Sequence, residues 1–102
     1  LTEARRIATL ASAANLRVAP HVWGGAVGLA TACHFIASLP ASPHTDHPPH
    51  PSMLEYDMSD NALRTQLLKV PLRLEAGHVL LPEGQGLGIE LDSAAVERYR
   101  VC

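Results

Sequence analysis

The chain has 102 residues, 47% of them hydrophobic and 18% charged, with 8 Lys and Arg against 10 Asp and Glu and a net charge of -2. This near-neutral balance gives no electrostatic reason to expect a nucleic acid or an anionic membrane surface as a partner. No apolar run reaches the roughly 20 residues that cross a bilayer, so no membrane-spanning segment is predicted.

The first residues predict a helix that starts at Thr2, a suitable N-cap, and stops at Asn15, which tolerates the left-handed conformation. Apolar side chains recur along it at helical spacing, at Ile7, Leu10, Ala11 and Ala14. A helix with no lead-in and no initiator Met indicates a piece of a longer protein.

Two strand-and-helix units follow. Residues 17–22 alternate like a short strand, with His21 on the side opposite the bulky apolar residues. A Gly-Gly turn comes next, and residues 26–38 predict a helix whose small side chains permit close packing against a sheet. Residues 40–52 hold five of the eight prolines and predict an irregular loop.

The second strand is predicted at residues 53–57, with Glu55 on the side opposite the bulky apolar residues. A short helix follows, capped by Ser59 or Asp60 and carrying Leu63, Leu67 and Leu68. The alternation of helices and strands predicts an α/β architecture with parallel strands and right-handed crossovers. Two parallel strands cannot be covered on both faces or closed, so further strands are expected elsewhere.

The last third of the chain changes character. Residues 72–75 and 78–81 alternate and meet at Ala76-Gly77, which predicts a hairpin. A glycine-rich connection, residues 82–88, then leads to a final helix capped by Asp92 or Ser93.

The two cysteines do not indicate a disulfide framework, because Cys33 falls in an apolar helical pattern and Cys102 is the last residue. We therefore expect reduced thiols and a cytoplasmic protein. Only four aromatic residues are present, so aliphatic side chains must fill any core.

His21 and Glu55 form the most informative pair, because each lies near the end of its own predicted strand. Adjacent parallel strands would bring the two side chains together at one rim, where barrel enzymes place their sites. A histidine supplies a base near neutral pH, and a protonated carboxyl group donates a hydrogen bond to an anionic substrate. The competing interpretation is structural, with a satisfied histidine and a rim carboxylate.

Four segments match a pattern that we know. TEARRIATLA (residues 2–11) looks like the helix after the sixth strand of a (β/α) barrel, and APHVWG (19–24) like the seventh strand with its histidine. LEYD (54–57) looks like the eighth strand with its glutamate, and PEGQGLGIELD (82–92) like the return to a capping domain. Together they resemble the mandelate racemase and muconate lactonizing enzyme family of the enolase superfamily.

The resemblance implies a fold and a domain division. Residues 1–70 would be the last strands and helices of a TIM-type (β/α) barrel. Residues 71–102 would be a hairpin and a helix that return to the capping domain. The chain would then be an incomplete fragment of a longer enzyme.

The resemblance also implies a reaction, the abstraction of a proton next to a carboxylate by a magnesium-dependent lyase or isomerase. His21 would be the general acid/base, Glu55 would bind the substrate carboxylate by a hydrogen bond, and Trp23 would line the substrate pocket. Asp57 would be structural. The metal ligands would lie upstream, so this chain would supply none and would be inactive alone.

The implied substrate is a small carboxylate, a sugar acid or its lactone, and the parent enzyme would be a homo-oligomer. APHVWG looks most like acid-sugar dehydratases and galactarolactone cycloisomerases. Muconate-type enzymes and dipeptide epimerases usually use a lysine as base, so His21 argues against them. A non-catalytic truncated remnant and a small α/β interaction module are the alternatives of another class.

Other patterns are interpreted as structural. The set His44, Asp46, His47 and His50 could bind zinc, but its spacing matches no closed motif. The glycines at 84, 86 and 88 lack the lysine of a phosphate-binding loop. His34 and His78 are interpreted as a helix-face histidine and a hairpin residue.

Overall fold

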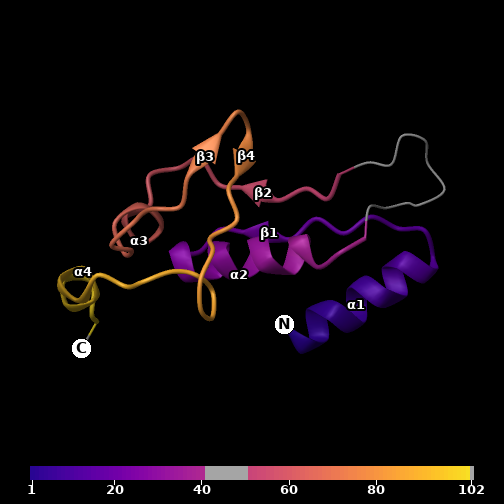
Figure 1. The fold of residues 1–102 in the computed structure, drawn as a ribbon, viewed down its shortest axis with the longest axis horizontal. Helices are drawn as coiled ribbons and strands as arrows, with labels where there is room; N and C mark the ends of the chain where they lie inside the picture. Colours follow the sequence, from indigo (N-terminus) through magenta and orange to yellow (C-terminus); the bar gives the residue numbers. More distant parts are fainter. Residues whose placement is uncertain (41–50, 102) are drawn as a thin grey trace.

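The computed structural model of the protein describes residues 1–40 and 51–101. Helices and strands alternate through the first two thirds of the chain, and a hairpin and a last helix follow (Figure 1). The elements are α1 (Thr2–Ala13), β1 (His21–Val22), α2 (Ala26–Ala37), β2 (Glu55–Tyr56), α3 (Ala62–Thr65), β3 (Leu74–Glu75), β4 (His78–Val79) and α4 (Ser93–Arg98).

Helix α1 ends as predicted but does not begin as predicted. Leu1 occupies the N-cap position without a side-chain hydrogen bond, so the prediction of Thr2 as the cap is wrong. Asn15 has a φ of 55°, as expected for the residue that stops the helix. The amides of Asn15 and Leu16 donate to the carbonyls of Ser12 and Ala11, at 3.0 and 2.8 Å, which closes the last turn.

The buried face of α1 differs from the predicted one. Ala8 is the buried residue of this helix, whereas Ile7 and Leu10 are 60% and 73% exposed. The predicted apolar stripe therefore does not form the core face. Instead two small residues of α1, Ala8 and Ser12, line a cavity of about 40 Å³ together with residues 16–19 of the segment that leads to β1.

Strands β1 and β2 pair in parallel, which confirms the predicted relation between the two strands. His21 lies opposite Glu55 and Val22 opposite Tyr56. The ladder is shorter than the predicted strands at residues 17–22 and 53–57, although the Glu55 amide also donates to the carbonyl of Pro20 at 3.1 Å.

Helix α2 holds most of the core. It connects the two parallel strands along the chain and contacts both β1 and α3 (Figure 1). Its small side chains let it lie close to its neighbours, and Leu29 is its fully buried large residue. Six of the nine buried apolar residues of the described chain belong to it: Ala26, Leu29, Ala30, Ala32, Cys33 and Phe35.

Helix α3 is short and has a different cap from the one predicted. Asn61 occupies the N-cap position and its side chain accepts from the Arg64 amide, so Ser59 and Asp60 were the wrong residues. The helix ends at Thr65, and Leu68 lies beyond it. Leu68 is buried and pairs with Leu91 in an isolated antiparallel bridge, which ties the segment after α3 to the segment before α4.

The hairpin forms where it was predicted. Leu74 lies opposite Val79 and Glu75 opposite His78. The turn residues Ala76 and Gly77 have φ values of 48° and 78°, as a tight two-residue hairpin turn requires.

The glycine-rich segment folds back over α2, as the interpretation of a chain turn expects. The His34 Nε2 atom lies 3.0 Å from the carbonyl oxygen of Leu87. Gly88 has a φ of 65°, and a Cβ atom there would lie 2.8 Å from the carbonyl group of Pro82. Asp92 then caps α4 by accepting from the amides of Ala94 and Ala95, which confirms one of the two predicted caps.

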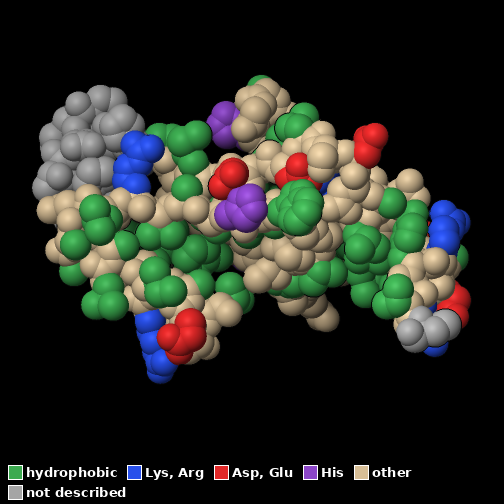
Figure 2. Space-filling model, turned by 180° about the vertical axis from the view of Figure 1, so that it is seen from behind, with side chains coloured by type: hydrophobic (Ala, Val, Ile, Leu, Met, Phe, Trp, Pro, Cys, Tyr) green, Lys and Arg blue, Asp and Glu red, His purple; other side chains and the backbone are tan. Residues whose placement is uncertain are grey.

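The described chain leaves much apolar surface uncovered. Hydrophobic side chains are scattered between polar and charged ones over the face shown in Figure 2. The large exposed ones include Ile7, Leu10, Leu16, Trp23, Met53, Met58 and Val70. This surface is of the kind that a larger assembly or domain covers.

We therefore expect the 102-residue chain alone to self-associate through its uncovered apolar side chains. Replacing both Ile7 and Leu10 by Lys should weaken this association by at least roughly tenfold, because each buried aliphatic side chain contributes about 1.5–3 kcal/mol. Analytical ultracentrifugation measures the effect. Thr9→Lys is the matched control, since it adds charge to the same helix without removing apolar area. Equal association of the double variant and the parent chain would contradict the prediction.

Candidate functional site

The candidate site is built on the two paired strands. Because His21 and Glu55 are directly opposite in the ladder, their side chains leave the sheet on the same side. The His21 Nδ1 atom lies 3.0 Å from the Glu55 Oε2 atom. The structure thus brings together the imidazole and the carboxyl group that were singled out in the sequence.

The pair is open to solvent. The side chains of His21 and Glu55 are 66% and 68% exposed, so water screens their attraction and the contact adds little to stability. Trp23 follows β1 directly and is 71% exposed. The imidazole, the carboxyl group and the indole that follows β1 in the chain are therefore all exposed to solvent.

The larger clefts of the described chain lie elsewhere. One of about 850 Å³ runs between residues 70–73 and 80–90. A second, of about 610 Å³, lies between α1 and residues 38–40. Neither includes the histidine, the carboxyl group or the indole of the candidate site. We give more weight to the paired side chains, because proton transfer needs the reacting groups, whereas the walls of a pocket can come from other elements.

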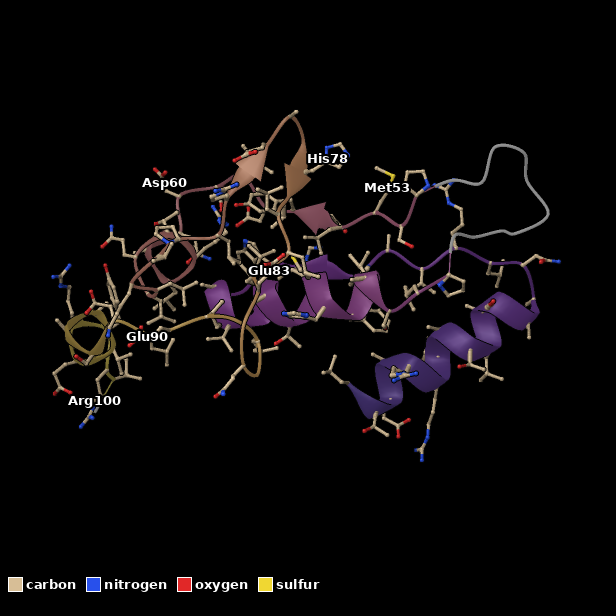
Figure 3. The ribbon with its side chains drawn as sticks, in the orientation of Figure 1. Met53, Asp60, His78, Glu83, Glu90 and Arg100 are labelled. Carbon is tan, nitrogen blue, oxygen red and sulfur yellow. The ribbon has the colours of Figure 1, made fainter. Side chains whose placement is uncertain are left out.

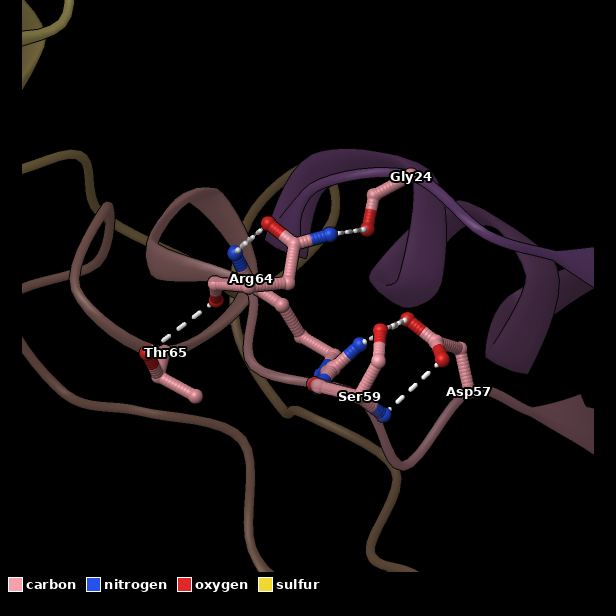
Figure 4. A network of polar contacts seen from close by, with 6 residues as sticks. Gly24, Asp57, Ser59, Arg64 and Thr65 are labelled. Carbon is pink, nitrogen blue, oxygen red and sulfur yellow. Dashed lines mark hydrogen bonds and ion pairs between the residues drawn. The ribbon is translucent and has the colours of Figure 1, made fainter.

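Asp57, the residue predicted to be structural, organises the segment that leaves β2 (Figure 4). Its carboxylate accepts from the Ser59 amide at 2.9 Å, from the Ser59 hydroxyl at 2.8 Å and from the Arg64 Nη1 atom at 2.6 Å. Arg64 also donates to the Ser59 carbonyl and lies over the ring of Tyr56, 5.6 Å from its centroid. The network fixes the residues that directly follow Glu55.

The hydrogen bonds from the Ser59 amide and hydroxyl lower the pKa of the Asp57 carboxyl group below its ordinary value, and Arg64 adds to the shift. The side chains of Arg64 and Asp57 are only 9% and 15% exposed. The shift therefore reflects a closed network of donors around one carboxylate.

Asn61 links the segments that follow the two strands. The sequence predicted Ser59 or Asp60 as the helix cap and did not single out Asn61. Its Oδ1 atom accepts from the Arg64 amide at 3.3 Å, and its Nδ2 atom donates to the Gly24 carbonyl at 3.4 Å. The only signal in the sequence was a run of polar residues after β2, which predicts a cap without selecting the residue.

The described residues do not fit a bound metal ion. No group of three His, Cys, Asp or Glu side chains within residues 1–40 and 51–101 is close enough to hold one. His34 and His78 each contact a backbone carbonyl, of Leu87 and Ala76. The zinc candidates His44, Asp46, His47 and His50 lie outside the described residues, as does Cys102. In the part of the chain that the structure describes, no helix is long and apolar enough to cross a bilayer.

Comparison with known proteins assigns the family. Residues 1–95 match the family model of enolase C-terminal domain-like proteins. The chain belongs to this family. This confirms the resemblance to the mandelate racemase and muconate lactonizing enzymes that the four sequence segments carried.

Two curated relatives of this enolase C-terminal domain-like chain are named as sugar-acid enzymes. It is 39% identical over 100 residues to the D-galactarolactone cycloisomerase of Agrobacterium fabrum, and the match covers 98% of this chain and 26% of that protein. It is 23% identical over 100 residues to the arabinonate dehydratase of Saccharolobus solfataricus, and the match covers 98% of this chain and 24% of that protein. The chain thus spans about a quarter of the length of these relatives.

Solved structures agree with the family. A mandelate racemase-like protein of Bordetella bronchiseptica superposes with a TM-score of 0.82 at 35% identity, over 99% of this chain and 24% of that one. The 3,6-anhydro-D-galactonate cycloisomerase of Zobellia galactanivorans gives a TM-score of 0.76 at 34% identity, over 96% and 25%. The predicted mixed α/β fold is therefore that of the enolase C-terminal domain of mandelate racemase-like structures.

The Asp57 network gives a pH prediction for the complete gene product. Because the pKa of Asp57 is lowered on folding, the unfolded state binds more protons, and the stabilisation is fully present above about pH 4 and lost as pH falls below it. Asp57→Asn should lower the melting temperature near neutral pH, and the difference from the wild type should shrink toward about pH 3.

Differential scanning calorimetry at both pH values measures this effect. Asp60→Asn is the matched control, since Asp60 is an exposed carboxylate three residues away (Figure 3). The network would have no role in stability if the Asp57 and Asp60 variants melted alike at every pH.

Proposed function

We propose that this chain is the C-terminal part of an enolase-superfamily enzyme that removes the proton next to the carboxylate of a sugar acid or its lactone. The observation that carries the proposal is the contact between His21 and Glu55 on adjacent parallel strands. The named activities of the relatives support the substrate class, since they act on galactarolactone, arabinonate and anhydrogalactonate.

His21 is the proposed general acid/base. Its Nδ1 atom contacts Glu55, which leaves Nε2 as the ring nitrogen that takes the substrate proton. The imidazolium that forms is stabilised by the adjacent carboxyl group, because a charged donor strengthens the hydrogen bond between them. The imidazolium returns the proton to the same face of the carbon, which gives exchange without inversion, or gives it to a departing group in an elimination, whereas a racemisation takes its proton from a second acid on the opposite face.

Glu55 has the complementary role in the proposal. A carboxyl group beside an anionic substrate is kept protonated and donates a hydrogen bond to the substrate carboxylate. That hydrogen bond strengthens as negative charge moves onto the carboxylate oxygens during proton removal. Trp23, next to the same strand end, lines the pocket and excludes water from one side of the substrate.

The rest of the proposed site lies outside this chain. Residues 1–70 form the last strands and helices of a TIM-type barrel, and residues 71–102 pack toward a capping domain. The complete enzyme uses Mg²⁺, which supplies charge stabilisation for the enediolate oxygens when bound. In the proposal its ligands lie upstream of this chain, as the family resemblance implies. A cytoplasmic homo-oligomer is the form in which we propose that it acts.

The role of His21 is tested by substitution in the complete gene product. His21→Asn should lower the rate of α-proton exchange into deuterated solvent by roughly 10²–10⁴-fold, because the base that removes the proton is lost. Glu55→Gln should reduce the same rate through weaker charge stabilisation. Proton exchange is the right readout, since racemisation, dehydration and cycloisomerisation share this first step.

His78→Asn is the matched control, because His78 is an exposed histidine on β4, in the other strand pair, and its ring contacts the Ala76 carbonyl. It should exchange at the wild-type rate. Wild-type exchange by His21→Asn on the native sugar acid would remove the imidazole from the base role and with it the proposal.

A second test compares the 102-residue chain with the complete gene product. The chain alone should catalyse no exchange, because its described residues hold no metal cluster and its reactive pair is open to water. The reading frame should continue upstream of Leu1 by roughly two to three times the present length, as a barrel and cap require. A start codon directly before Leu1 would favour a non-catalytic remnant or a small α/β interaction module.

A further inference from the structure

A seam of close contacts joins the turn after β1 to helix α3. Gly24 and Gly25 form this turn, directly after Trp23 and three residues after His21. Asn61, at the start of α3, donates from Nδ2 to the Gly24 carbonyl across 37 residues of sequence. The seam therefore connects the end of β1 to the segment that follows β2 (Figure 4).

We propose that Asn61 is a positioning residue for the candidate site, holding the turn after β1 so that His21 and Trp23 keep their places beside Glu55. The inference rests on the proposed function, because it assigns a role within that site. Asn61 itself touches neither the imidazole nor the carboxyl group, so it acts through the backbone of the turn.

The chemistry of the amide explains why an Asn serves here. Its oxygen accepts from the Arg64 amide and its nitrogen donates to the Gly24 carbonyl, so the two partners fix the orientation of the group. A flipped amide would set donor against donor and acceptor against acceptor. An Asp at this position still caps the helix but has no hydrogen to donate to Gly24, and the hydroxyl of a capping Ser is one bond shorter than the amide nitrogen, which is itself 3.4 Å from the Gly24 carbonyl, so it falls short.

Arg64, the partner of Asn61 within α3, is itself held in place by its contacts. Arg64, whose amide bonds to Asn61, has a side chain that is only 9% exposed and bonded to Asp57. Asp57 comes two residues after Glu55. Hydrogen bonds thus run from Asp57 through Arg64 and Asn61 to Gly24. They join the segments that follow the two strands.

Close packing at Gly25 marks the same seam independently. A Cβ atom at Gly25 would lie 3.2 Å from the Leu63 carbonyl oxygen and 3.3 Å from the Leu63 Cβ atom. The Gly25 backbone is extended, with a φ of -77°, so only the lack of space favours glycine there. The N-cap of α2 and helix α3 therefore lie so close together that a methyl group at Gly25 would push against the Leu63 backbone.

The experiment, on the complete gene product, separates the hydrogen bond from Asn61 to Gly24 from the helix-capping role of Asn61. Asn61→Ser and Asn61→Asp keep the helix cap and lose the hydrogen bond to Gly24. Both should lower kcat by roughly three- to tenfold and change KM less, because the base is displaced while most substrate contacts remain. Thr65→Val is the matched control, since it removes a hydrogen bond within the same helix, to the Asn61 carbonyl, without touching the turn.

The second readout does not depend on activity. The chain contains one Trp, so fluorine NMR of fluorotryptophan-labelled protein reports on the turn, with the Trp23 resonance assigned by Trp23→Phe. The resonance should shift or broaden in both Asn61 variants and stay unchanged in Thr65→Val. Gly25→Ala should move it as well, whereas Gly28→Ala, which meets nothing within 4 Å, should not.

An unchanged Trp23 resonance in both Asn61 variants would overturn the positioning role, as would an equal change in Thr65→Val. If the resonance moves but the wild-type protein exchanges no α-proton of any sugar acid, the positioning role of Asn61 is supported and the proposed function is wrong. If exchange occurs and the Asn61 variants match the wild type in both readouts, the proposed function is supported and the positioning role is wrong.

Discussion

The parallel register that sets His21 opposite Glu55 is the constraint on which the rest of the structure depends. In a parallel pair, directly opposed residues point to the same face, so this register brings an imidazole to 3.0 Å from a carboxyl group. A slip of one residue would set Val22 or Tyr56 in place of one partner and turn that partner's side chain away. The chemistry of the candidate site is therefore a consequence of strand alignment.

Two residue pairs form too short a ladder to hold that alignment unaided. Helix α2 supplies the packing, because its small buried side chains let it lie close to β1 and α3. The donors around Asp57 hold the segment after β2, and Asn61 ties that segment to the turn after β1. The polar contacts are each modest, but they act at the two strand ends, where a slip would begin.

The features that could be predicted from the sequence are those with a local cause. The hairpin at Ala76-Gly77 and the stop at Asn15 follow from backbone conformations that these residues tolerate, and the pair His21 and Glu55 follows from alternation plus strand order. The cap of α3 could not be selected among three adjacent polar residues, because the choice depends on Gly24, far away in sequence. The buried face of α1 depends on what packs against it, so its periodicity alone misled. The alternation of side chains along a strand places the paired residues but does not show that they react, so their catalytic role stays a prediction.

The exposed apolar face of α1 and the openness of the reactive pair have one explanation in the proposed enzyme. Strands β1 and β2 each lack a second neighbour in the described chain, and strands beside them would both wall the site and give α1 a surface to cover. A small interaction module would need a partner only for the exposed apolar side chains. It would have no use for an imidazole and a carboxylate in register at the strand ends. The alignment of that pair, more than the uncovered surface, therefore favours the enzyme over the module.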